Sequence, residues 1–109
     1  MLKALWAAIQ CGRHHGKGNK YKERGDLENA VMHFKQALPY AERTGNLGTV
    51  AFEMECSAIT YLEMKSPLEA KEYAESSLKL YRILTEQGKD DIFSEAVSRM
   101  EQIFSEIET

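Results

Sequence analysis

A gapless internal repeat with a period of forty residues limits what this chain can fold into. The segment YKERGDLENAVMHFKQAL at 21–38 aligns with YLEMKSPLEAKEYAESSL at 61–78. Each copy has a polar turn, Gly25-Asp26 or Ser66-Pro67, between two segments with helical periodicity. Repeats of this kind indicate stacked helical hairpins, and we predict an all-α fold of about five helices. The matched positions include Tyr21 and Tyr61, Glu23 and Glu63, Ala30 and Ala70, Leu38 and Leu78, and Gly18 and Ala58.

The second unit is the more regular of the two. Residues 47–64 and 70–84 each carry one apolar stripe with three- and four-residue spacing. Between them, Ser66 as N-cap, Pro67 as the first helical residue and Glu69 as the third predict a capping box worth about 1 kcal/mol. Asp90 and Asp91 are predicted to start a last helix with one apolar side.

The first unit departs from this regularity. Its second stripe, 30–41, contains Pro39, which removes one backbone hydrogen bond and is expected to bend the helix. The segment before it, 12–24, is polar and holds Gly12, Gly16 and Gly18, each costing close to 1 kcal/mol relative to alanine in a helix. We expect this helix to form only if Gly18 and Tyr21 pack tightly, with residues 2–11 either extending it or folding back on it.

Composition and charge restrict the class of protein. The chain has 109 residues, 43% of them hydrophobic, which suits one domain or a piece of a longer array. Two cysteines are too few for a disulfide framework, and no stretch approaches the roughly 20 apolar residues that span a bilayer, so we expect a cytoplasmic protein without membrane contact. The net charge of −3 is uneven: residues 1–24 carry six Lys and Arg against one Glu, and the remainder carries eight against sixteen acids.

Unit one carries a spaced set of small and aromatic residues around its turn: Gly18, Tyr21, Gly25-Asp26, Ala30, Phe34 and Ala37. This pattern resembles that of the tetratricopeptide repeat (TPR) family. Unit two keeps Ala58, Tyr61 and Ala70 but has Lys65-Ser66 at the turn, and the period of forty is longer than the usual 34. The resemblance implies one domain over 1–109, with repeats at 11–50 and 51–90 and a capping or partial third-repeat helix at 91–109.

The sequence offers little chemistry. The glycines around Lys17 have the wrong spacing for a phosphate-binding loop. Cys11, His14 and His15 have ligand-like helical spacing, but a closed zinc site needs a fourth ligand, so we expect no metal and no cofactor. No serine or cysteine has a recognisable nucleophile context, and we expect a protein that is not an enzyme.

What the resemblance implies is a peptide groove. In TPR folds the first helix of each unit lines a concave face that takes up a segment of a partner. Carried over to this chain, that face is formed by His15, Asn19, Lys22, Phe52, Glu55, Ile59, Leu62, Ile92, Glu95 and Arg99. The chaperone-binding members grip a carboxylate with a five-residue clamp, of which only Asn19 is present, since His15, Cys56, Ile92 and Ala96 stand at the other positions.

The expected function is therefore that of an adaptor or scaffold that binds a protein or peptide on this concave face. One alternative is a self-associating structural module, in which the C-terminal helix, with Ile92 and Ile103 outside its main stripe, docks on another copy. Further alternatives are a co-chaperone that binds chaperone C-terminal peptides, and binding of RNA or another polyanion through 13–24. The overall acidity opposes the last of these, and we do not expect a nucleic-acid partner.

Overall fold

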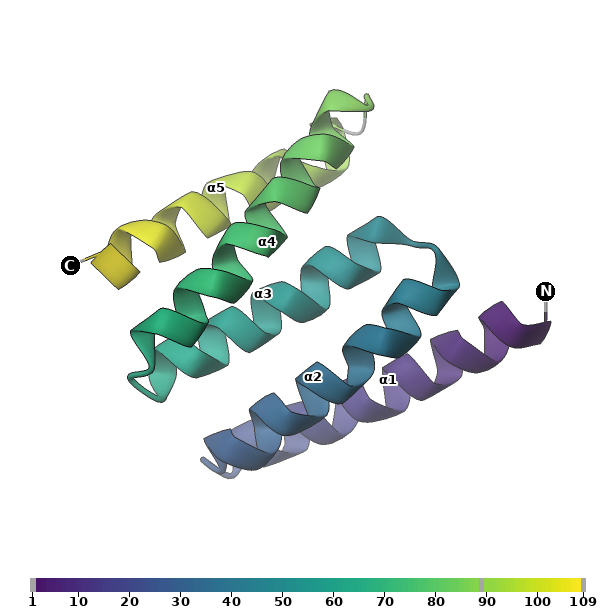
Figure 1. Cartoon of the computed structure of the whole chain (residues 1–109), viewed down its shortest axis with the longest axis horizontal. Coiled ribbons are helices and arrows are strands. Elements are labelled where there is room, and N and C mark those ends of the chain that lie inside the picture. Colours follow the sequence, from purple (N-terminus) through teal and green to yellow (C-terminus); the bar gives the residue numbers. More distant parts are fainter. Residues whose placement is uncertain (1, 89, 109) are drawn as a thin grey trace.

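The described residues form a stack of five α-helices (Figure 1). The computed structural model describes residues 2–88 and 90–108, with the backbone alone for 90–92. Each helix packs on the next in the chain, and α3 also contacts α5. Over the described residues there is no strand, and the predicted all-α hairpin stack is confirmed. The helices are α1 (Leu2–Glu23), α2 (Leu27–Thr44), α3 (Leu47–Glu63), α4 (Pro67–Glu86) and α5 (Asp90–Glu108).

The N-terminal segment extends the first helix and does not fold back. Residues 2–11 continue into 12–23 as one helix in spite of its glycines. Ala7, Cys11 and Gly18 form its buried line, and Trp6 meets Tyr40 of α2 edge to face at 5.4 Å between ring centroids. The long α1 therefore obtains from α2 the packing that its own polar sequence lacks.

The forty-residue repeat is visible in the stacked rings that join the two helices of each hairpin. Tyr21 stacks on His33 at 5.4 Å, and forty residues later Tyr61 stacks on Tyr73 at 5.7 Å. The crossing points correspond as well. Gly18 lies directly against the ring of Phe34, and in the second hairpin the equivalent residues are Ala58 and Ala74, both fully buried. In the first hairpin a glycine faces a phenylalanine, and in the second hairpin the two equivalent residues are both alanines.

The turns within the two hairpins have the same geometry. Gly25 and Lys65 both have a left-handed backbone, with φ of 79° and 61°. In each turn, the amide of this residue donates to the carbonyl three residues back, and the following amide donates to the carbonyl five residues back. This is the Schellman arrangement, which satisfies the last carbonyls of a helix and favours glycine. Lys65 adopts it at a steric cost that Gly25 does not have.

Helix starts follow the sequence less closely. Asp26 and Asn46 cap α2 and α3 by accepting from the amides of Asn29 and Thr49 at 3.2 Å. Ser66 is the N-cap of α4 and Pro67 follows it, but the serine side chain makes no capping hydrogen bond, so that part of the prediction is wrong. With backbone angles close to those of Asp26, the shorter serine side chain does not place its hydroxyl at the amide. Pro39 lies within α2, which continues to Thr44.

Replacing Lys65 by glycine should stabilise the protein. Glycine removes the strain of a side chain at a left-handed φ of 61°, but it also gives the unfolded chain more conformational entropy. The net increase in the free energy of unfolding should be about 0.5–1 kcal/mol. Chemical denaturation measures it. Lys65→Ala removes the same charge but keeps the strain and should give no gain, and Gly25→Ala should lose about 1 kcal/mol. Equal effects of the glycine and alanine variants at 65 would contradict this assignment.

Gly18→Ala should destabilise the protein although alanine is the better helix former. A Cβ at this position lies 2.6 Å from Cε1 of Phe34, a ring that is itself buried. Overpacking of about 1–3 kcal/mol exceeds the propensity gain of about 1 kcal/mol. Gly12→Ala is the matched control, because nothing lies within 4 Å of its added Cβ, and it should stabilise α1. Urea denaturation of both variants decides; a similar gain in both would refute the close approach.

Candidate functional site

The face formed by α1, α3 and α5 is held together by charged side chains that α3 supplies. On one side, Lys22 of α1 lies 3.4 Å from Glu63. On the other side, the guanidinium of Arg99 from α5 donates twice to Glu55, at 2.9 and 3.0 Å. The three helices therefore present one continuous surface, which we call the α1–α3–α5 face. Its members are the predicted groove residues whose side chains are described: His15, Asn19, Lys22, Phe52, Glu55, Ile59, Leu62, Glu95 and Arg99.

Glu55 is a structural residue of this face. Only 4% of it is exposed, because Arg99 covers it from α5 and the Tyr81 hydroxyl donates to it from α4 at 2.8 Å. Burial and the hydrogen bond to Glu55 raise the pKa of Tyr81, so this hydroxyl stays protonated and donates. The sequence prediction treated Glu55 as a ligand-binding side chain. The structure shows its oxygens occupied by Arg99 and Tyr81, since a carboxylate this deeply buried needs partners.

A second buried acid, Glu53, joins α3 to α1. His15 Nδ1 lies 3.0 Å from Glu53 Oε1, and the Cys11 thiol lies 4.0 Å from the other oxygen. The hydrogen bond to Glu53 raises the pKa of His15, although burial acts in the opposite direction. The imidazole also packs between Phe34 and Phe52, with centroids 5.4 and 5.3 Å away. His15 is thus fixed in place and half-buried.

Cys11, His14 and His15 do not meet at one point. Cys11 and His15 face Glu53, whereas His14 Nδ1 lies 3.2 Å from His33 Nδ1 on α2. Within the described ranges, no group of three His, Cys, Asp or Glu side chains is arranged to hold a metal ion. The cysteines are also poor nucleophiles: burial raises the pKa of both thiols, that of Cys56 to about 12.

The exposed centre of the face is apolar. Phe52 on α3 is 44% exposed, and Ile59 and Leu62 follow it, each half-buried. Asn19 of α1 is exposed on one flank, and Glu95 and half-exposed Arg99 of α5 lie on the other, beside a depression of about 410 Å³. The side chain of Ile92 lies outside the described residues. The structure therefore brings together an apolar strip and polar flanks.

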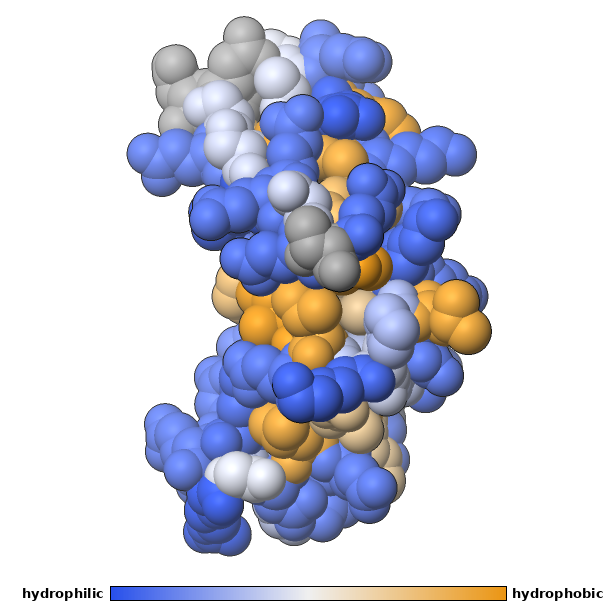
Figure 2. Space-filling view, turned by 90° about the vertical axis from the view of Figure 1, so that its left-hand side faces the viewer, coloured by the Kyte–Doolittle hydropathy of each residue, from blue (hydrophilic) through white to orange (hydrophobic). Residues whose placement is uncertain are grey.

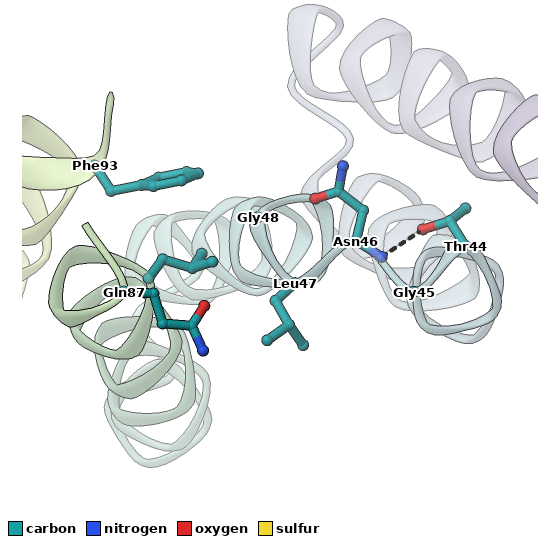
Figure 3. Close-up of a pocket in the computed structure, with 8 residues that line it drawn as sticks. Thr44, Gly45, Asn46, Leu47, Gly48, Gln87 and Phe93 are labelled. Atoms are coloured by element: carbon teal, nitrogen blue, oxygen red, sulfur yellow. Dashed lines mark hydrogen bonds between the residues drawn. The ribbon is translucent and has the colours of Figure 1, made fainter. Parts of the chain in front are cut away.

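Other surfaces offer less. A pocket of about 380 Å³ lies between the α2–α3 turn and Phe93 at the start of α5 (Figure 3). Its lining is uncharged, and the Thr44 hydroxyl in it donates to the Ala41 carbonyl while accepting from the amide of Asn46. On the side of the molecule shown in Figure 2, hydrophobic residues gather in patches in the lower half of the view, separated by hydrophilic ones. The described residues that line the pocket beside Phe93 therefore bring no ionisable side chains together.

Glu53 and Tyr81 are the contributors to this face that sequence reasoning missed. The signal for Glu53 was present: Glu53 and Glu55 interrupt an otherwise uncharged stretch of α3 from Leu47 to Leu62. Two acids in an otherwise uncharged helix, which is expected to pack on several neighbours, indicate buried carboxylates with polar partners. Their partners come from α1, α4 and α5, and the local sequence around Glu53 and Glu55 does not predict them.

Comparison of the chain with models of protein families, with curated proteins and with solved structures finds no match. Among the described residues, no helix is both long and apolar enough to cross a membrane.

The His15–Glu53 pair should be detectable by NMR titration. In the folded protein His15 should titrate above the usual value of 6.5, and His14, whose pKa is lowered by burial and then by His33, should titrate below it. Because the folded-state pKa of His15 is raised, the pair stabilises the fold fully below pH 6.5, and this contribution is lost as pH rises through that pKa. Glu53→Gln should lower the pKa of His15 and leave that of His14 in place. An unchanged His15 in this variant would show that Glu53 is not its partner.

Proposed function

We propose that this chain is a TPR-like, non-enzymatic interaction module that binds a segment of a protein partner on the α1–α3–α5 face. The observation that carries the proposal is the exposure of Phe52 in line with Ile59 and Leu62, on a helix whose neighbours are fixed by ion pairs. Large exposed side chains of this kind anchor protein interfaces when a partner buries them. A preformed surface also loses little conformational entropy on binding.

The electrostatics of the face suggest the chemistry of the partner segment. Arg99 is tied to Glu55 yet half-exposed, and Lys22 and Asn19 lie on the opposite flank. Glu55, which would have opposed an anion, is paired with Arg99, and Glu53 is buried and lies within hydrogen-bond distance of His15. A short segment with an apolar side chain for Phe52 and an acidic side chain on either flank fits this arrangement.

The structure supports this proposal over pairing through the C-terminal helix. The large apolar residues of the second half of α5, Ile103, Phe104 and Ile107, pack on the core cluster of α3 and α4. Described positions that α5 leaves exposed are polar, among them Ser98, Glu101 and Gln102. A helix pair between copies would need an apolar outer stripe there.

A cytoplasmic setting belongs to the same proposal. Both Cys11 and Cys56 are free thiols, and free thiols persist in reducing compartments. The carboxylate clamp of chaperone-binding TPR proteins fits this chain poorly, because the first clamp position is His15, whose ring lies 3.0 Å from Glu53.

Peptide display against the purified chain tests the proposal. Selected peptides should carry an apolar residue next to an acidic one, and their affinity should fall at least about tenfold for Phe52→Ser. Leu68→Ser is the matched control, since Leu68 is an 80% exposed leucine on α4, away from this face. Circular dichroism verifies that both variants fold. Peptides that bind the two variants equally well would place the binding surface elsewhere.

A further inference from the structure

The outer side of α1 carries an exposed apolar quartet. Leu2, Leu5, Trp6 and Ile9 are 82%, 58%, 48% and 53% exposed. Their spacing of three and four residues puts them on one side of the helix, opposite the buried line of Ala7, Cys11 and Gly18. In Figure 1 the N-terminal turns of α1 project beyond α2 and α3 at the edge of the stack. Trp6 lies at the margin of this side, where its ring meets Tyr40 of α2 edge to face, whereas Leu2, Leu5 and Ile9 are each more than half exposed.

The same side becomes basic further along the helix. Arg13, Lys17 and Lys20 are exposed, and at about 100° per residue they continue the line of the quartet. Arg24, also exposed, follows directly after α1 ends at Glu23. Glu23, at the margin of this line, is the one acid in the first 24 residues. The result is a single exposed surface, roughly 33 Å long, that is apolar in its first half and cationic in its second. We call it the α1 outer face.

We infer that the α1 outer face binds an anionic lipid surface, with α1 lying in the plane of the interface. Leucine, isoleucine and tryptophan on one part of a helix surface, with lysine and arginine beside them, are what such helices use. Tryptophan is favoured at the boundary between headgroups and acyl chains. The cationic half attracts acidic headgroups, and this attraction adds to the burial of the quartet.

The charge of the rest of the molecule fixes the orientation. Beyond residue 24 the chain has eight Lys and Arg against sixteen acids. A negatively charged membrane therefore repels the body of the protein while it attracts α1. This combination favours docking by the α1 outer face alone and leaves α4 and α5 turned away.

Other occupants fit the surface less well. RNA or DNA would use the cationic half but give Leu2, Leu5 and Ile9 nothing to bury against. A second copy paired through the quartet would leave the cationic halves without a counter-charge, and four side chains per copy fall far short of the roughly 20–30 residues a side of a standard interface. A lipid surface uses both halves.

A helix that lies on a membrane surface differs from one that spans the membrane, and hydropathy detects only the spanning kind. The expectation of no membrane contact rested on the lack of a spanning stretch, and no described helix could span. A helix that lies on the surface needs an apolar side and nearby cations, which α1 has. The inference is independent of the proposed peptide-binding face, which uses other residues.

Sedimentation with vesicles tests the inference. The full chain should bind vesicles of phosphatidylcholine with phosphatidylserine, bind pure phosphatidylcholine vesicles at least about tenfold more weakly, and be released by high salt. Leu5→Ser/Ile9→Ser and Arg13→Gln/Lys17→Gln/Lys20→Gln should each reduce binding at least about tenfold. Leu68→Ser and Lys71→Gln/Lys79→Gln, which alter exposed residues of α4, should bind as the wild type does. In bound protein, Trp6 fluorescence should shift to the blue.

Three results would overturn the inference. The first is no binding to acidic vesicles, and the second is binding that survives the loss of Leu5 and Ile9, which would indicate a simple polyanion site. The third is a dimer in light scattering that the Leu5→Ser/Ile9→Ser variant abolishes, which would assign the quartet to a second copy. Circular dichroism of every variant excludes unfolding as the cause of lost binding.

Discussion

Close approach of the helix pairs at small side chains is the constraint on which the rest of this structure depends. Small residues lie at these contacts: Gly18 is buried, and Ala30, Ala37, Ala58, Ala70 and Ala74 are all fully buried. Such a core gains little from the size of any one side chain. The chain compensates with a few large buried residues, Phe34, Tyr81 and Met100. Gly18 and Phe34 show the consequence: a Cβ at position 18 would lie 2.6 Å from Cε1 of Phe34, so the buried ring fits because residue 18 is a glycine.

Buried charge on α3 follows from the same geometry. A helix that contacts α2, α4 and α5 has little surface left, so Glu53 and Glu55 lose water and need polar partners. Those partners come from α1, α4 and α5, and they lock the relative positions of the helices that form the α1–α3–α5 face. Removing one partner would leave an uncompensated buried carboxylate, which is a larger loss than removing an exposed ion pair. Residues that look like ligand contacts in the sequence therefore act here as supports for the surface beside them.

The sequence predicted what is periodic and missed what is particular to one contact. The register of forty, the turns at Gly25 and Lys65, and the equivalence of Tyr21 and Tyr61 all follow from local pattern. The stacking of these two rings on His33 and Tyr73 does not follow from it. The sequence does not decide whether residues 2–11 extend α1 or fold back on it. The long helix depends on Trp6 packing on Tyr40 and on Gly18 packing on Phe34, and local sequence does not reveal such contacts between helices. Glu55 was assigned to the surface for the same reason: its helical position is right, but the reach of Arg99 from forty-four residues away covers it.

The geometry of α1 relates the two proposed surfaces to each other. His15, Asn19 and Lys22 lie roughly a third of a turn around the helix from the line of Leu5, Ile9 and Lys17. His15 and Lys22 are bonded to α3, so the helix cannot roll about its axis without breaking both contacts. A lipid surface bound along one side of α1 would thus leave the α1–α3–α5 face open at a fixed angle to it. The ion pairs of α3 would then set the direction in which a docked protein presents Phe52 to a partner.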